Sequence, residues 1–176
     1  MVGGGLAVRV LHVAGASNTG KTRLLEALLP LIGAAAVIKW THHPLGPDKS
    51  GSDTDRLGSQ TVPVVLAHPD GFVVRPGAAD RFDVYDRAAQ WLDDQSLLVV
   101  EGDKHGFAPV IWLGADVPQD VKPCLVIGPQ RLRDVAWHEA DIPLSKQAAK
   151  ASAIYIRDSL EQFTYYLPRS FHAGIH

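Results

Sequence analysis

Short apolar runs alternate with amphipathic stretches along this chain, and the alternation predicts its elements. The run "LAVRVLHVAG" (Leu6–Gly15) is short and rich in valine, which predicts a buried strand. After a glycine-rich loop, leucines recur at helical spacing, which predicts an amphipathic helix from about Gly20 to about Gly33. The next apolar run, "AAVIKW" (Ala35–Trp40), predicts a second strand.

Later patterns extend this order of elements. "TVPVVLA" and "FVVRP" flank "HPDG", which predicts a hairpin that turns at Pro69–Gly71. "DRFDVYDRAAQWLDD" places Phe82, Tyr85, Ala89 and Leu92 on one face and predicts a helix. Further strands are expected at "LLVVEGD" (Leu97–Asp103), "PVIWLG" and "PCLVIG", and a closing helix at Leu144–Phe163 with Ser145 as its N-cap.

Strands that alternate with helices favour one fold class. We expect an α/β fold of the P-loop NTPase type, with a mostly parallel sheet flanked by helices on both faces and an inserted β-hairpin. The length of 176 residues and the 46% hydrophobic content are typical of one globular domain, so residues 1–176 are expected to form a single nucleotide-binding domain.

Charge and cysteine content narrow the functional classes. The formal net charge is -2, which provides no broad attraction to nucleic acid or to an anionic membrane. Cys124 is the single cysteine, so no intrachain disulfide can form, and a cytoplasmic protein is expected. The longest apolar run, Ala27–Ile38, is interrupted by Pro30 and Gly33 and is too short to span a bilayer, which takes roughly 20 residues.

The stretch "GASNTGKT" carries the clearest chemistry. It fits the pattern G-x-x-x-x-G-K-[ST], after a predicted strand and at the start of a predicted helix. Glycines let the backbone N–H groups wrap around phosphate oxygens, and the helix start adds positive potential. The lysine supplies a full charge to the β- and γ-phosphates, and the last hydroxyl can ligate Mg²⁺. The predicted phosphate-binding residues are Gly15, Ala16, Ser17, Asn18, Thr19, Gly20, Lys21 and Thr22.

Magnesium bound at Thr22 needs an acidic partner. In such folds an acid commonly ends the buried strand beside the loop strand. Glu101, which ends "LLVVE", is the first candidate for this metal-side and catalytic role, and Asp103 is the second. A glutamate that merely faces solvent at a strand end is the alternative.

The segment Thr41–Gln60 is polar and dense in glycine, proline and aspartate, and loops of this length are commonly functional. It follows a strand at the sheet edge where ligands bind in open α/β folds, so Asp53 can hold Mg²⁺ through water. A solvated polar loop is the alternative. We interpret His12 as a core histidine. Arg131 and Arg133 either reach phosphates from a late loop or are solvated.

Four stretches, in order, resemble the molybdopterin-guanine dinucleotide biosynthesis protein B (MobB) family: "GASNTGKT", "VIKWTHH", "DKSGSDTDR" and "VVEGDKH". The resemblance implies a P-loop protein that binds GTP with Mg²⁺, hydrolyses it weakly, forms a homodimer and assists the guanylyltransferase that attaches GMP to molybdopterin. It also implies catalytic and metal-binding roles for Asp53 and Glu101, and a nucleotide-binding role for Arg56. The apolar hairpin Val62–Arg75 adds to the expectation of a dimer, since such a hairpin needs a partner to cover it.

Two other function classes remain open on the sequence alone. One is a P-loop kinase or ligase that acts on a small metabolite, and the other is a nucleotide-gated adaptor without useful turnover. The guanine-reading motif Asn-Lys-x-Asp is absent from the sequence, so the preference for GTP rests on the resemblance. No base or arginine for fast phosphoryl transfer stands out, which favours slow turnover.

Overall fold

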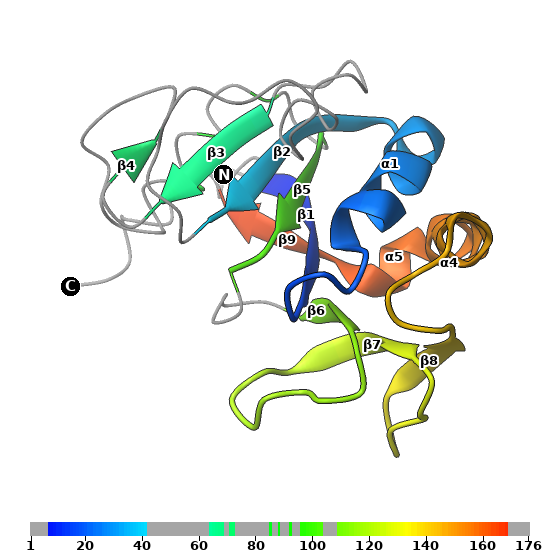
Figure 1. The fold of residues 1–176 in the computed structure, drawn as a ribbon. Helices are drawn as coiled ribbons and strands as arrows, with labels where there is room; N and C mark the ends of the chain where they lie inside the picture. Colours follow the sequence, from blue (N-terminus) through cyan, green and yellow to red (C-terminus); the bar gives the residue numbers. More distant parts are fainter. Residues whose placement is uncertain are drawn as a thin grey trace.

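The structure, a computed structural model, describes residues 7–41, 64–68, 71–72, 85, 88, 92, 96–103 and 109–168. Within these residues, nine strands form one sheet, in the order β4-β3-β2-β5-β1-β6-β7-β8, with β9 beside β1 (Figure 1). The pairs that involve β4 or β9 are antiparallel, and the others are parallel. The strands are β1 (Ala7–Gly15), β2 (Ala34–Trp40), β3 (Val64–His68), β4 (Gly71–Phe72), β5 (Leu97–Glu101), β6 (Val110–Leu113), β7 (Pro123–Gly128), β8 (Ala136–Glu139) and β9 (Thr164–Pro168).

Strand β1 lies at the centre of the sheet and has three partners. One edge pairs with β5 from Arg9 to Val13. The other edge is shared, because β9 pairs with its first part and β6 pairs with its last part, from Val13 to Gly15. The carboxyl end of β1 therefore lies between those of β5 and β6. That position is the one where ligands bind in open α/β sheets.

Helix α1 (Lys21–Ile32) begins and ends at the glycines that the sequence indicates. Gly20 is its N-cap and Gly33 its C-cap, and both adopt left-handed backbone angles. The leucines at helical spacing face the core, since Leu25 and Leu28 are fully buried. The predicted strand, loop and helix order is confirmed here.

Two apolar layers cover the sheet. On one face α1 and α4 (Lys146–Asp158) pack over alternate residues of the central strands, such as Val37 and Val99. On the other face Ile38 and Val100 belong to a second cluster. Tyr85, Ala88 and Leu92 are buried in that second cluster, and Tyr85 and Ala88 are helical, in agreement with a helix at this place in the sequence.

The prediction of one continuous closing helix from Leu144 to Phe163 is wrong. The structure ends α4 at Asp158, continues after Ser159 as the short helix α5 (Leu160–Phe163), and then turns into β9. Ser159, the C-cap of α4, has non-helical angles (φ -125°, ψ 25°), so the helix is interrupted there. The N-cap prediction is confirmed, because Ser145 Oγ accepts a hydrogen bond from Ala148 N at 3.1 Å.

The hairpin prediction agrees with the backbone, since β3 and β4 pair antiparallel with His68 opposite Gly71. Strands β8 and β9 were not predicted. None of the helices in the described ranges has both the length and the apolar character needed to cross a bilayer.

Candidate functional site

The phosphate loop connects β1 to α1, and its two glycines occupy positions that side chains cannot share. Gly15 has φ +148°, and a Cβ there would lie 2.4 Å from Leu113 O. Gly20 has φ +95°, and a Cβ there would lie 2.9 Å from Leu144 N. The glycine spacing in "GASNTGKT" therefore reflects close backbone approach as well as backbone flexibility.

The lysine of the loop lies across the loop itself. Lys21 Nζ donates to Ala16 O at 2.7 Å and to Gly15 O at 3.3 Å. Thr19 Oγ1 also donates to Ala16 O, at 2.9 Å. These bonds hold the ammonium group over the turn, where the loop N–H groups and the start of α1 add positive potential.

The segment between β8 and α4 anchors the loop from outside. Leu144 N donates to Thr19 O at 3.1 Å, and Arg23 Nη1 donates to Leu144 O. These two hydrogen bonds join residues more than 120 positions apart in the chain. The position of the phosphate loop therefore depends on this distant segment as well as on β1 and α1.

Glu101 ends β5 and faces the start of α1. Its Oε1 accepts a hydrogen bond from Thr22 Oγ1 at 3.4 Å, and its Oε2 lies 3.8 Å from Lys39 Nζ. Its side chain is 6% exposed, so the alternative of a solvent-facing strand end is wrong. Lys39 and Glu101 are directly opposite each other in the β2–β5 register, which places both side chains on the α1 face.

Contacts with two residues of β1 hold the turn after Glu101 in place. Gly102 N donates to Val13 O at 2.9 Å, and Gly102 O lies 2.7 Å from His12 Nε2. A carbonyl only accepts, so His12 Nε2 carries the proton of this bond. His12 is 1% exposed and bonded, as expected for a core histidine.

Asp103 takes part in a different contact. It accepts a hydrogen bond from Tyr85 OH at 2.8 Å, and Tyr85 belongs to the cluster on the opposite face of the sheet from α1. Burial raises the pKa of Tyr85 well above its ordinary value, and the Asp103 carboxylate adds to the rise, so the phenol stays a neutral donor. Of the two acids, the structure brings Glu101 to the phosphate loop.

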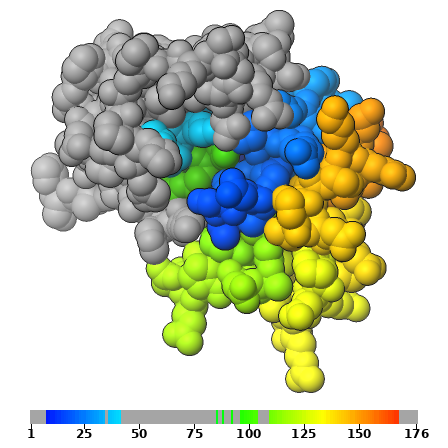
Figure 2. Space-filling model, viewed as in Figure 1, coloured from blue at the N-terminus to red at the C-terminus, as the bar shows by residue number. Residues whose placement is uncertain are grey.

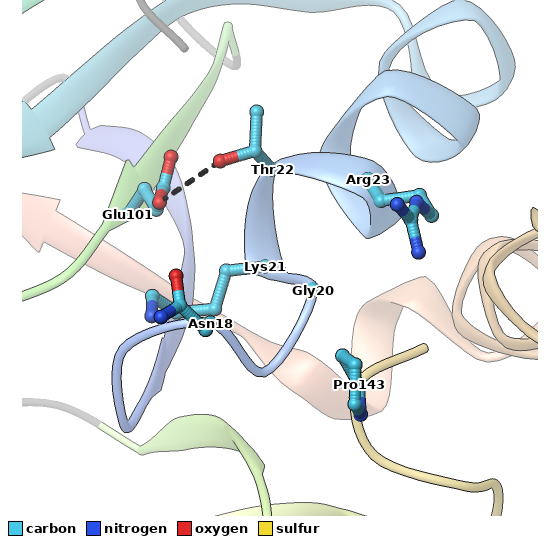
Figure 3. A pocket seen from close by; sticks show the side chains of 7 residues that line it. All are labelled: Asn18, Gly20, Lys21, Thr22, Arg23, Glu101 and Pro143. Atoms are coloured by element: carbon cyan, nitrogen blue, oxygen red, sulfur yellow. Dashed lines mark hydrogen bonds between the residues drawn. The ribbon is translucent and has the colours of Figure 1, made fainter. Parts of the chain in front are cut away.

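A cavity of about 320 Å³ lies over the start of α1. Figure 2 shows the blue segment that contains the phosphate loop at the molecular surface, beside atoms coloured yellow to orange. Figure 3 shows Lys21 and Asn18 on one side of Gly20, and Arg23 and Pro143 on the other. The lining residues are Asn18, Gly20, Lys21, Thr22, Arg23, Glu101 and Pro143.

The donors at one end of this cavity fit Mg²⁺. Thr22 and Glu101 offer a hydroxyl and a carboxylate oxygen 3.4 Å apart, and hard oxygen donors are what this cation takes. The described residues contain no group of three or more His, Cys, Asp or Glu side chains that could hold an ion by themselves. Mg²⁺ commonly binds through one or two carboxylates together with substrate phosphates and water, so a nucleotide would complete this set.

Some predicted site residues lie elsewhere. Asp53 and Arg56, like the rest of residues 42–63, lie outside the described residues. Arg131 and Arg133 are exposed between β7 and β8 and do not line the cavity.

Sequence reasoning missed Lys39, Arg23 and Pro143 as neighbours of the site. The sequence could have indicated Lys39, because it is a charged residue near the end of an apolar strand. The sequence could not have indicated Arg23 and Pro143, because their proximity to each other depends on how the β8–α4 segment packs against α1.

The family model described as "Molybdopterin guanine dinucleotide synthesis protein B" (MobB) matches residues 10–123, more than half of the chain. The chain belongs to the MobB family. A relative from Haemophilus influenzae, named "Molybdopterin-guanine dinucleotide biosynthesis adapter protein", is 34% identical over 115 residues. That match covers 60% of this chain and 63% of the relative, so the chain spans less than two thirds of the relative's length.

Two solved MobB structures share the fold. The crystal structure of a molybdopterin-guanine biosynthesis protein B has 19% identity and a TM-score of 0.50, and covers 86% of this chain and 99% of its own. The Bacillus subtilis MobB structure has 18% identity and a TM-score of 0.51, and covers 88% and 97%. The fold is P-loop NTPase-like, with a parallel sheet flanked by helices, as the sequence predicts.

Proposed function

We propose that this MobB-family chain binds GTP with Mg²⁺ at the phosphate loop, hydrolyses it slowly and serves as an accessory protein in molybdopterin guanine dinucleotide biosynthesis. The observation that carries the proposal is the cavity in which Lys21, Thr22 and the buried Glu101 meet at the start of α1. Lys21 would address the phosphates, and Thr22 and Glu101 would hold Mg²⁺ directly or through water. Bound Mg²⁺ neutralises phosphate charge and orients the triphosphate.

The groups that line this cavity support the proposal of slow hydrolysis. Fast phosphoryl transfer needs a positioned base or an arginine that reaches the transferred phosphate. Among the described lining residues, Glu101 is the one carboxylate, and it is already engaged by Thr22 and Lys39. Arg23 has its Nη1 bonded to Leu144 O. The described part of the site therefore supports binding better than rapid turnover.

The family description and the name of the Haemophilus influenzae relative both mention a guanine dinucleotide, which supports guanine as the base. The word adapter in that name supports a protein partner. An adapter in this biosynthesis would act beside the guanylyltransferase that joins GMP to molybdopterin. We further propose a cytoplasmic homodimer, with the hairpin around β3 and β4 in the contact between subunits. Light scattering that shows a monomer mass at micromolar concentration would contradict the dimer.

Calorimetric titration tests the nucleotide. GTP, ATP and GDP are each titrated with and without Mg²⁺. We expect GTP to bind more tightly than ATP, and Mg²⁺ to strengthen binding of the triphosphate more than of the diphosphate. Failure of both triphosphates to bind at millimolar concentration with Mg²⁺ would overturn the assignment of the phosphate loop.

The role of Glu101 is tested by a matched pair of variants. Glu101→Gln keeps the shape of the side chain but removes its charge, so it should slow GTP hydrolysis more than it weakens GTP binding. Glu139→Gln is the control, because Glu139 also ends a parallel strand but is exposed and does not line the cavity. Equal hydrolysis rates in both variants would remove Glu101 from the reaction.

A metabolite kinase or ligase is the competing function. Its lid candidates Arg131 and Arg133 are exposed and do not line the cavity, so the described geometry gives that reading no support. Rapid transfer of the γ-phosphate to a metabolite, with GTP hydrolysis much slower, would favour it over the proposal.

A further inference from the structure

Lys39 is a charged side chain in a place built for apolar ones. It belongs to β2 between the fully buried Ile38 and the half-buried Trp40, and its side chain is 14% exposed. On the α1 face of the sheet its predecessor is Val37, a core residue. A lysine at this depth needs a compensating charge.

Glu101, which is proposed above to bind Mg²⁺, supplies a compensating charge. Lys39 Nζ lies 3.8 Å from Glu101 Oε2, and the Glu101 side chain is 6% exposed. Breaking such a buried pair by removing one partner leaves an uncompensated charge, which is strongly destabilising. The ion pair therefore contributes to holding the Glu101 carboxylate in place.

Glu101 is thereby shared between an ammonium group and the metal position. Its Oε2 is the Lys39 side and its Oε1 is the Thr22 side. A divalent cation at Thr22 and Glu101 would meet the positive charge of Lys39 across one carboxyl group. In a site this buried, like charges repel far more than they do in water. Bound Mg²⁺ and Lys39 would therefore weaken each other's interaction with the same carboxylate.

We propose that Lys39 is a positioning residue that occupies Glu101 in the metal-free site and sets the Mg²⁺ concentration at which nucleotide binding is strengthened. The part of this inference that concerns Mg²⁺, called the metal half below, rests on the proposed function. The part that concerns the Lys39–Glu101 ion pair does not depend on any nucleotide. Lys39 would thereby keep the empty site electrically balanced and keep Mg²⁺ binding weak until the phosphates of a nucleotide contribute to it.

The metal half is tested by calorimetric titration of GTP over a range of Mg²⁺ concentrations. Lys39→Met keeps an unbranched side chain of similar length but removes the charge. It should lower the Mg²⁺ concentration for half-maximal strengthening by roughly threefold or more, as expected for two interacting groups in contact. Lys39→Arg restores the charge and should bring this concentration back toward that of the parent. Lys122→Met is the control, because Lys122 is an exposed lysine outside the cavity.

Two results would overturn the metal half. One is an unchanged Mg²⁺ dependence in Lys39→Met. The other is weaker GTP binding with a higher Mg²⁺ requirement, which would make Lys39 a direct ligand of the nucleotide. Absence of nucleotide binding by the parent protein would instead overturn the proposed function and the metal half together, so the two failures are distinguishable.

The ion pair is tested without nucleotide or metal, by melting temperature. Lys39→Met alone should melt below the parent, because Glu101 keeps its charge without its cation. Adding Glu101→Gln should recover part of that loss, because the amide needs no cation. Melting-temperature changes that are simply additive in the double variant would show that Lys39 and Glu101 are not coupled and would overturn the inference.

Discussion

Two glycines flank α1 and differ mainly in their surroundings, which makes them a matched pair for substitution. Gly20 at the N-cap has φ +95° and Gly33 at the C-cap has φ +61°. A Cβ at Gly33 would meet nothing within 4 Å, whereas a Cβ at Gly20 would lie 2.9 Å from Leu144 N and 3.0 Å from Leu144 Cβ. Both positions carry left-handed strain for alanine, and only Gly20→Ala adds a collision with backbone.

The magnitudes follow from these two terms. Left-handed angles cost an alanine roughly 1–2 kcal/mol. Loss of freedom in the unfolded chain offsets about 0.4–1 kcal/mol of that cost. Gly33→Ala should therefore lower the free energy of unfolding by at most about 1.6 kcal/mol. Gly20→Ala must also displace Leu144, and forced overpacking costs about 1–3 kcal/mol more.

Thermal unfolding followed by circular dichroism measures the difference in stability between the two variants. In a chain of this size 1 kcal/mol shifts the melting temperature by about 2–4 °C, so Gly20→Ala should melt roughly 2–12 °C below Gly33→Ala. GTP binding should also weaken in Gly20→Ala alone, because the bond from Leu144 N to Thr19 O holds the phosphate loop. Equal stability and equal GTP affinity in the two variants would refute the close contact between the loop and the β8–α4 segment.

Three shorter predictions follow from contacts described above. Lys21→Ala should raise the GTP dissociation constant roughly tenfold to a hundredfold, through loss of a charge-assisted contact worth about 1.5–3 kcal/mol. Lys146→Ala, at the first residue of α4 as Lys21 is of α1, should not, and equal effects would contradict a phosphate role. Ser145→Ala should lower the free energy of unfolding by about 1 kcal/mol in urea titrations, more than Ser159→Ala, whose side chain caps no helix. Burial raises the pKa of the Cys124 thiol from its ordinary value near 9.0 to about 11. At pH 8 a disulfide reagent should therefore label Cys124 far more slowly in the native protein than in urea. The stability linked to the neutral thiol is fully present below pH 9.0 and is lost as the pH rises through about 11. Equal labelling rates would contradict its burial.

The sequence by itself determined the features that depend on neighbouring residues. The strand, glycine loop and helix from Ala7 to Ile32 follow from a valine-rich run, two left-handed glycines and leucines at helical spacing. Glu101 was found because a buried parallel strand that ends in an acid is a local pattern. Ser145 was found because N-capping acts within one turn.

Only the tertiary structure decided which distant residues meet. Strand β9 pairs with the first part of β1, and the paired residues Ala7 and Pro168 are 161 positions apart in the chain. Nothing within "TYYLP" indicates that partner. The register of β2 against β5 places Lys39 opposite Glu101, and a shift of one residue would have put the two side chains on opposite faces. Leu144 reaches the phosphate loop through the packing of the β8–α4 segment on α1. Periodicity indicates which face of an element is buried but not which element covers it. The sequence therefore predicts the phosphate loop and Glu101, whereas the packing decides that Lys39 lies beside Glu101 and that Leu144 is hydrogen-bonded to the loop and to Arg23.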